Sequence, residues 1–189
     1  DHGDQLGERD LWFKQTFYEQ SVRVPLILSW PGKLPEGQTR DHIVSLVDLT
    51  ATLVDATGHA PLPDIDGVSL LGIAVDPDAV WQNETYSEYC TDGLKAWSGG
   101  KKILTRMVRK GRFKFNYFHN DRHQLFDMET DPDETTNLVN EPAYQSVRAE
   151  LEALVLANWD PVAIEEKINA SIECKTVLEA WAKNVKPKD

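Results

Sequence analysis

The first four residues, Asp1-His2-Gly3-Asp4, place a carboxylate beside an imidazole and follow the pair with a glycine. Glycine adopts backbone angles that other residues avoid, so the chain can turn sharply directly after the pair. An Asp and a His on one loop can reach the same metal ion, but two ligands are too few for a protein metal site. Without further context a surface turn is the simpler interpretation, and metal ligation is the alternative.

Lys14 is the second candidate, because it lies in the aromatic stretch Leu11-Trp12-Phe13-Lys14-Gln15-Thr16-Phe17-Tyr18. A lysine that is partly withdrawn from water can hold an oxyanion such as sulfate or phosphate. The alternative is a surface lysine whose aliphatic stem lies over its aromatic neighbours.

Other reactive residue types lack a context that would activate them. Cys90 and Cys174 lie in no recognisable nucleophile motif, so we interpret both as free thiols. An acidic run begins at Asp127 and ends at Glu134, but it lacks the spacing and the glycine of a calcium loop and is interpreted as a turn.

Composition excludes several classes of protein. The formal net charge of −11 over 189 residues disfavours a nucleic-acid partner, which needs a basic surface. No apolar run approaches the roughly 20 residues of a membrane span, so no membrane partner is expected. Two cysteines make neither a disulfide framework nor a zinc pattern. The low cysteine count favours the cytoplasm over the periplasm.

The elements that must position the candidates begin with Val22–Trp30, an apolar and β-branched run that predicts a strand buried on both faces of a parallel sheet. Ser45 and Asp48 resemble a capping box, and apolar residues at helical spacing predict a helix that ends at Gly58. The stretch from Gly58 to Pro77 is rich in Gly, Pro and Asp and predicts a long surface connection.

The second half has the pattern of an antiparallel sheet with a helix. Strands are predicted over 84–90, 103–109, 112–118 and 124–128, with a tight turn at Lys110-Gly111. Alternation over 112–118 predicts a half-buried strand with Arg112, Lys114 and Asn116 on its wet face. An amphipathic helix is predicted between Pro142 and Trp159, followed by a helical tail.

These elements predict an α/β chain in three parts. Residues 1–78 would be the end of an α/β layer, 79–157 a small antiparallel sheet with a helix, and 158–189 a helical tail. A chain that begins at Asp1, without methionine and inside a dense polar motif, is expected to be a piece of a longer protein.

Several motifs together resemble the C-terminal portion of a sulfatase, within the alkaline-phosphatase-like superfamily. The motifs keep the family's order and spacing over nearly all of residues 1–157. They are Asp1-His2-Gly3-Asp4-Gln5-Leu6-Gly7-Glu8, Leu11-Trp12-Phe13-Lys14, Glu19 through Arg23-Val24-Pro25, Ser29-Trp30-Pro31-Gly32, Val47-Asp48-Leu49, Asp66-Gly67-Val68-Ser69-Leu70, Gln124-Leu125-Phe126-Asp127, Asp131-Pro132-Asp133-Glu134 and Asn137-Leu138. The expected fold is therefore the end of an alkaline-phosphatase-like sandwich plus a small antiparallel sheet-and-helix subdomain.

The resemblance implies roles for individual residues. Asp1 and His2 would be two ligands of one divalent cation, Ca²⁺ or Mn²⁺ with Mg²⁺ as a third candidate, and an imidazole suits Mn²⁺ better than Ca²⁺. His at the second position is similar to the choline-sulfatase and phosphonate-monoester-hydrolase branches. Lys14 would contact the substrate sulfate, whereas Glu19 and Arg23 would be structural or would support the site. The tail is similar to the choline-sulfatase end segment, which implies a homo-oligomer.

One departure from the family pattern concerns activity. Sulfatases carry a Cys- or Ser-x-Pro-x-Arg motif whose first residue becomes formylglycine, the hydrated nucleophile. Cys90 is followed by Thr-Asp-Gly-Leu and Cys174 by Lys-Thr-Val-Leu, so neither matches. The nucleophile and the remaining metal ligands are expected in an N-terminal part of the same protein, and this chain alone is expected to be inactive.

Three functions follow as hypotheses. The first is hydrolysis of a small sulfate ester by a metal-dependent formylglycine sulfatase, with the substrate alcohol left open. The second is a phosphonate or phosphodiester hydrolase of the same superfamily, because Asp-His and a lysine suit either oxyanion. The third is a non-catalytic fragment that serves subunit association.

Overall fold

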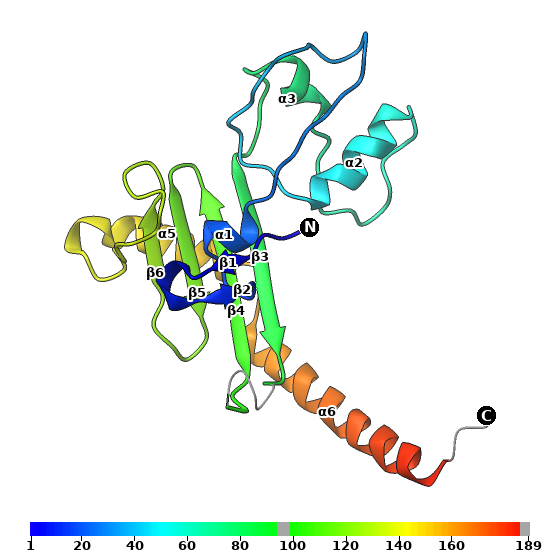
Figure 1. Cartoon of the computed structure of the whole chain (residues 1–189), viewed down its shortest axis with the longest axis vertical. Helices are drawn as coiled ribbons and strands as arrows, with labels where there is room; N and C mark the ends of the chain where they lie inside the picture. The colour runs from blue at the N-terminus through cyan, green and yellow to red at the C-terminus, as the bar shows by residue number, and fades with distance from the viewer. Residues whose placement is uncertain (94–98, 186–189) are drawn as a thin grey trace.

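The computed structural model describes residues 1–93 and 99–185. A four-stranded sheet lies at the centre, with helix α5 on one face and an N-terminal segment on the other (Figure 1). A lobe built from α2 and α3 lies beyond one end of the sheet, and the long helix α6 extends away from the other end (Figure 1).

The central sheet is an antiparallel meander in the order β3-β4-β5-β6. Its strands are β3 (Glu84–Thr91), β4 (Ile103–Lys110), β5 (Phe113–Phe118) and β6 (Gln124–Asp127). Gly111 joins β4 to β5 with a left-handed φ of 52°, as predicted for a tight turn. All four predicted strands are thus confirmed.

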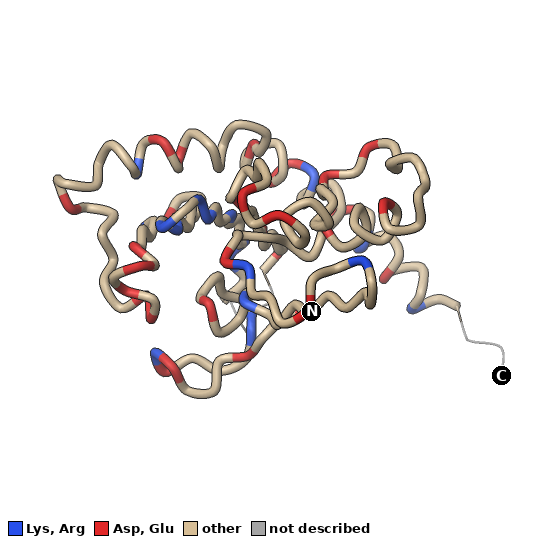
Figure 2. Tube along the Cα trace, turned by 90° about the horizontal axis from the view of Figure 1, so that it is seen from above, with Lys and Arg blue, Asp and Glu red and all other residues tan. Residues whose placement is uncertain are grey.

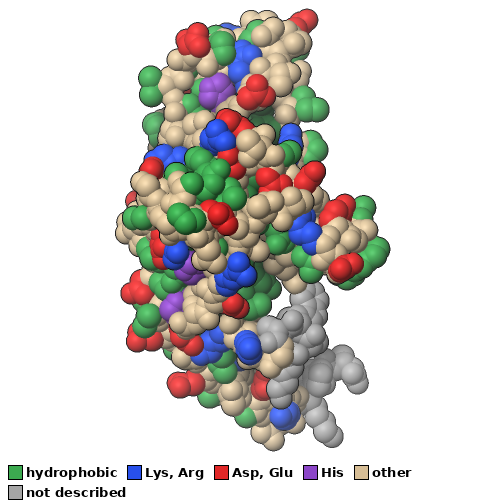
Figure 3. Space-filling model, turned by 90° about the vertical axis from the view of Figure 1, so that its left-hand side faces the viewer, with side chains coloured by type: hydrophobic (Ala, Val, Ile, Leu, Met, Phe, Trp, Pro, Cys, Tyr) green, Lys and Arg blue, Asp and Glu red, His purple; other side chains and the backbone are tan. Residues whose placement is uncertain are grey.

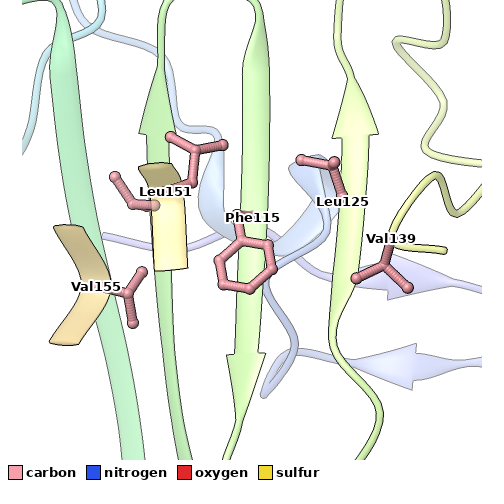
Figure 4. Packing of buried hydrophobic residues seen from close by; sticks show 6 residues of the cluster. Phe115, Leu125, Val139, Leu151 and Val155 are labelled. Atoms are coloured by element: carbon pink, nitrogen blue, oxygen red, sulfur yellow. The ribbon is translucent and has the colours of Figure 1, made fainter. Parts of the chain in front are cut away.

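One face of the sheet carries the apolar core. Phe115 on β5 and Leu125 on β6 point toward Leu151 and Val155 of α5 (Gln145–Leu156), as Figure 4 shows. The 3-10 helix η2 (Pro142–Tyr144) leads into α5, so the predicted amphipathic helix is confirmed. At about 25 cal/mol per Å² of apolar surface, burial of these side chains is the main stabilising contribution to this layer.

The opposite face of the sheet is also buried, which corrects the prediction of a half-buried strand. Lys114 and Asn116 have almost no exposed surface, because the N-terminal segment covers them. That segment consists of β1 (Gln5–Leu6), the 3-10 helix η1 (Glu8–Asp10), β2 (Trp12–Phe13) and α1 (Glu19–Val22). Sequence alternation assigned this face to solvent because the covering segment lies far away along the chain.

The lobe is held together by polar side chains. Helix α2 (Val47–Ala56) ends two residues before Gly58, whose left-handed φ of 72° follows the helix as predicted. Asp48 accepts a hydrogen bond from the amide of Ser45 at 2.8 Å, which is one half of the expected capping box. The buried residues of α2 are Asp48 and Thr52, whose side chains accept from the amides of Val68 and Leu70. The apolar side of α2 is left toward solvent.

Two predictions for the first half are wrong. Residues 23–30 form no strand, and Leu26, Ile27, Leu28 and Trp30 are exposed. A strand buried in a parallel sheet needs neighbouring strands, and within the described residues none pairs with this segment. The surface connection from Gly58 to Pro77 contains a short helix, α3 (Leu71–Val75), which forms because Leu70 and Ile73 are buried.

Helix α6 (Pro161–Asn184) confirms the helical tail. Asp160 caps it, because its carboxylate accepts from the amides of Val162 and Ala163. Over the described ranges, no helix is both long and apolar enough to cross a membrane. Acidic and basic residues are interspersed along the chain and over one face of the molecule (Figures 2 and 3).

Candidate functional site

Asp1, His2 and Lys14 lie together in the structure. The Lys14 Nζ is 3.0 Å from His2 Nε2, and that nitrogen is 3.7 Å from the carboxylate of Asp1. All three side chains face solvent, with Asp1 90% and His2 38% exposed. The structure thus brings the three candidates to one accessible point, while their roles stay a prediction.

The contacts of His2 define its tautomer. Nδ1 lies 2.9 Å from the carbonyl oxygen of Gly3, which can only accept, so Nδ1 carries the proton. Nε2 then presents a lone pair, and the Lys14 ammonium donates to it. A backbone carbonyl at one ring nitrogen and an acceptor lone pair at the other is the arrangement of a metal-binding histidine, and here Lys14 occupies that lone pair.

A short hairpin returns Lys14 to His2. β1 pairs with β2 in antiparallel register, and Lys14 follows β2 directly. Phe13 and Gln15 have left-handed φ values of 69° and 83°, on either side of the lysine. Two such residues cost energy and are a recurring feature of functional loops.

Gly3 fixes the Asp1-His2 pair against α1. Its amide donates to the carbonyl of Ser21 at 2.9 Å. A Cβ at this position would lie 2.0 Å from the carbonyl oxygen of Gln20, which no side chain could tolerate. Gln5 is fully buried beneath the loop and donates to Thr16 at 2.5 Å and to Ser21 at 3.4 Å.

Glu19, for which the resemblance implied a structural position or one supporting the site, binds the central sheet. It pairs with Lys114 at 2.9 Å and with Arg109 at 3.3 Å, both on the central sheet. Burial alone would raise the pKa of the Glu19 carboxyl, but the charges of Lys114 and Arg109 prevail and lower it. The sequence reasoning missed Lys114 and Glu134, since neither lies near Glu19 along the chain and no local signal marks them.

The donor atoms of Asp1 and His2 fit a divalent cation. One carboxylate and one imidazole whose Nε2 carries a lone pair are suitable donors for Mn²⁺, and the carboxylate also suits Ca²⁺ or Mg²⁺. Within residues 1–93 and 99–185, no group of three or more His, Cys, Asp and Glu side chains is placed to hold a metal. The described part of the chain therefore offers this pair and no complete ligand set.

Within the described residues neither the cysteines nor the acidic run contacts Asp1, His2 or Lys14, although Glu134 at the end of that run pairs with Lys114. Burial, together with the negative charge of Glu88, raises the pKa of the Cys90 thiol, which keeps it a weak nucleophile. Cys174 is exposed on α6, and both thiols are free. Asp131 accepts hydrogen bonds from the amides of Thr135 and Thr136, so the acidic run is a turn as predicted.

Comparison with known proteins identifies the family. Residues 7–159 match the sequence family described as "N-sulphoglucosamine sulphohydrolase, C-terminal". The chain belongs to the sulfatases. More narrowly, it is a member of this C-terminal family, and the expected α/β fold class is confirmed.

Individual relatives agree with this assignment. A choline-sulfatase of Rhizobium meliloti is 36% identical over 178 residues, which cover 90% of this chain and 32% of that protein. The structure of BT4656 in complex with its substrate D-glucosamine-2-N,6-O-disulfate has a TM-score of 0.72 at 28% identity, covering 82% of this chain and 31% of that one. A phosphonate monoester hydrolase of Agrobacterium radiobacter has a TM-score of 0.69 at 25% identity, covering 82% and 33%.

The chain therefore spans about a third of the length of the relatives that it matches.

Proposed function

We propose that the protein carrying this chain is a sulfatase that hydrolyses a small sulfate ester. The observation that supports this most directly is the meeting of Asp1, His2 and Lys14 at one exposed point, on a chain of the sulfatase family. A carboxylate, an imidazole with an acceptor lone pair and an ammonium group together suit a cation and an oxyanion held side by side.

In this proposal Asp1 and His2 hold one divalent cation, Mn²⁺ or Ca²⁺ with Mg²⁺ as a third candidate. A bound cation would stabilise negative charge that develops on the sulfuryl oxygens. With His2 Nε2 engaged by a cation, Lys14 would lose this acceptor and would be free to donate to an oxygen of the substrate. Gly3 keeps the imidazole oriented through its carbonyl oxygen.

The proposal includes an N-terminal part of the same protein that supplies formylglycine as the nucleophile and the remaining ligands. The exposed apolar side chains of Leu26, Ile27, Leu28 and Trp30 support such a partner. A contiguous run of this kind is unusual on a protein surface unless another surface covers it.

We also propose that the protein forms a homo-oligomer through α6. Val177, Leu178 and Trp181 are more than three-fifths exposed on this helix, which extends away from the sheet (Figure 1). Deleting residues 162–189 from the full-length protein is expected to lower the oligomer mass in light scattering. An unchanged mass would remove the tail from the interface.

The two free cysteines support a reducing compartment, so we propose the cytoplasm over the periplasm. Fractionation of the native cells would test this, with recovery in the periplasmic fraction as the opposing result.

A second candidate activity is hydrolysis of phosphonate monoesters or phosphodiesters. The likeness to the phosphonate monoester hydrolase fold supports it, and Lys14 and the Asp1-His2 pair would serve either oxyanion. The kcat/KM values of the full-length protein for 4-nitrophenyl sulfate and 4-nitrophenyl phenylphosphonate distinguish the two. Faster turnover of the phosphonate would replace the first proposal by the second.

The site itself is tested by substitution in the full-length protein. Asp1→Ala and His2→Ala are expected to abolish metal-dependent turnover, and wild-type rates in either variant would overturn the ligand assignment. Lys14→Ala is expected to lower kcat/KM, because it removes about 2–4 kcal/mol of transition-state stabilisation. Lys33→Ala, at an exposed lysine of the same chain, is the matched control and should be neutral.

A further inference from the structure

Lys114 is a fully buried cation on the sheet face opposite the apolar core. Its Nζ lies 2.9 Å from Glu19 and 2.8 Å from Glu134, whose side chain is also completely buried. Burying an ion pair costs about as much in lost hydration as it returns, and apolar residues of similar volume often stabilise a fold equally well. Stability alone therefore explains the position of this charge poorly.

The cluster holds the first residue of α1 by two different groups. Lys114 binds the carboxylate of Glu19, and Glu134 accepts a hydrogen bond from the Glu19 amide at 2.7 Å. Bonds to charged groups are directional and stronger than neutral ones, so they fix both the place and the direction of the helix start.

Helix α1 in turn fixes the Asp1-His2 pair. The Gly3 amide donates to Ser21 at 2.9 Å, near the end of the four-residue helix. Gly3 also packs so closely on Gln20 that no methyl group fits between them. A displacement of α1 must therefore displace Gly3 and the imidazole of His2, which bonds to the Gly3 carbonyl.

We infer that Lys114 is a positioning residue for the Asp1, His2 and Lys14 site, which it does not touch. It acts through Glu19 and α1, so that the central sheet holds the site in place. This inference rests on the proposed function, because it assumes that Asp1 and His2 bind a divalent cation.

The test measures Mn²⁺ binding to the full-length protein from the electron paramagnetic resonance signal of free Mn²⁺. Lys114→Met keeps the length of the side chain and removes its charge, and it is expected to weaken Mn²⁺ binding at least tenfold. The same variant is expected to lower kcat at limiting Mn²⁺, and excess Mn²⁺ should restore much of that loss. The metal affinity of the folded protein would not change if Lys114 only stabilised the fold.

Arg112→Met is the matched control. Arg112 immediately precedes β5, and its guanidinium pairs with the buried carboxylate of Asp127 and with Glu129 rather than with α1. This variant also leaves a buried carboxylate without its partner, so it should lower the melting temperature while leaving Mn²⁺ affinity unchanged. Equal loss of affinity in both variants would assign the effect to general stability and overturn the inference.

A second variant covers the case in which Lys114→Met fails to fold. Glu134→Gln keeps the shape of the side chain and an acceptor for the Glu19 amide, and it is expected to weaken Mn²⁺ binding at least threefold. Wild-type affinity in folded Lys114→Met or, where that variant does not fold, in Glu134→Gln would overturn the inference.

His2→Ala separates this inference from the function on which it rests. Loss of Mn²⁺ binding in His2→Ala, with wild-type binding in Lys114→Met, would refute the positioning role alone. Wild-type binding in His2→Ala would refute the metal site itself, and the inference with it.

Discussion

In the central sheet and α5, Val108, Phe115 and Val155 have no exposed surface, whereas in the preceding lobe Ile27 is 88% and Leu53 68% exposed. Both regions contain apolar runs in the sequence. Within the described residues, α5 covers one face of the sheet and the N-terminal segment covers the other (Figure 1).

The lobe is organised by polar contacts instead. Asp48 and Thr52 connect α2 to the loop before α3, and Arg40 donates to the carbonyls of Ile73 and Ala74. These bonds define its shape. Leu70 and Ile73 are buried, but Leu53 and the apolar residues of 26–30 are left exposed by the described part of the chain. The difference supports the proposal that another part of a longer protein covers the lobe.

The largest expected effect comes from core truncation. Phe115→Ala should lower the unfolding free energy of the 189-residue chain by about 3–5 kcal/mol, because it leaves a cavity under α5. Ile27→Ala should change it by no more than about 0.5 kcal/mol, because the side chain is exposed. Urea titration followed by tryptophan fluorescence measures both.

The same Ile27→Ala change sharpens the comparison in the full-length protein. If another part of the protein covers Ile27, its truncation to Ala should lower the free energy of unfolding by about 2–5 kcal/mol. A cost below about 0.5 kcal/mol there would mean that the lobe stays open to solvent.

An intermediate effect is expected at Asp48, which accepts from the amides of Ser45 and Val68. Asp48→Ala leaves both donors without this partner and should destabilise the lobe by about 1–3 kcal/mol. Amide exchange should accelerate in residues 45–75 and stay unchanged in β4 and β5. The exposed Asp41→Ala is the control, and equal acceleration in the sheet would mean that the two regions unfold together.

Acid should weaken the sheet layer through Asp127 and Glu19. The hydrogen bond from Arg112 lowers the pKa of Asp127, although burial opposes this shift. The pKa of Glu19 is lowered by the charges of Lys114 and Arg109. A carboxyl group whose pKa is lowered by folding stabilises the folded state at pH values above its ordinary pKa. This contribution is lost as the pH falls through the lower pKa of the folded state. Stability should therefore fall below about pH 4.5 for Glu19 and 3.8 for Asp127.

Asp127→Asn should be less stable at neutral pH and less sensitive to acid. Melting temperatures between pH 7 and pH 3 measure both, and an unaltered acid slope would remove Asp127 from the explanation.

The smallest effect is expected at His123, which stacks on Tyr117 with ring centroids 4.6 Å apart. Burial lowers its pKa and Arg148 adds to this, while Glu152 and Asp121 oppose it. The folded state thus favours the neutral ring, and its contribution should decline as pH falls from 6.5 through the folded value. His123→Phe should remove this slope, and an identical slope in the variant would contradict the assignment.

The sequence predicted the elements well where the signal is local. Alternation and Gly111 predict the β4–β5 hairpin, and apolar spacing predicts α2 and α5, because these features depend on neighbouring residues. The resemblance also selected Asp1, His2 and Lys14, which the structure places together. The predicted strand at Val22–Trp30 is wrong, because an apolar run specifies burial but not the partner that provides it.

By itself, then, the sequence determined the four strands of the central sheet, helices α2, α5 and α6, the sulfatase family and three candidate site residues. Only the tertiary structure decided which faces of the sheet are buried and which residues hold the site in place. Lys114 shows why, since alternation assigns it to solvent while a partner 95 residues away buries it. A buried charge depends on counter-charges that folding brings together, and no local pattern encodes where they come from.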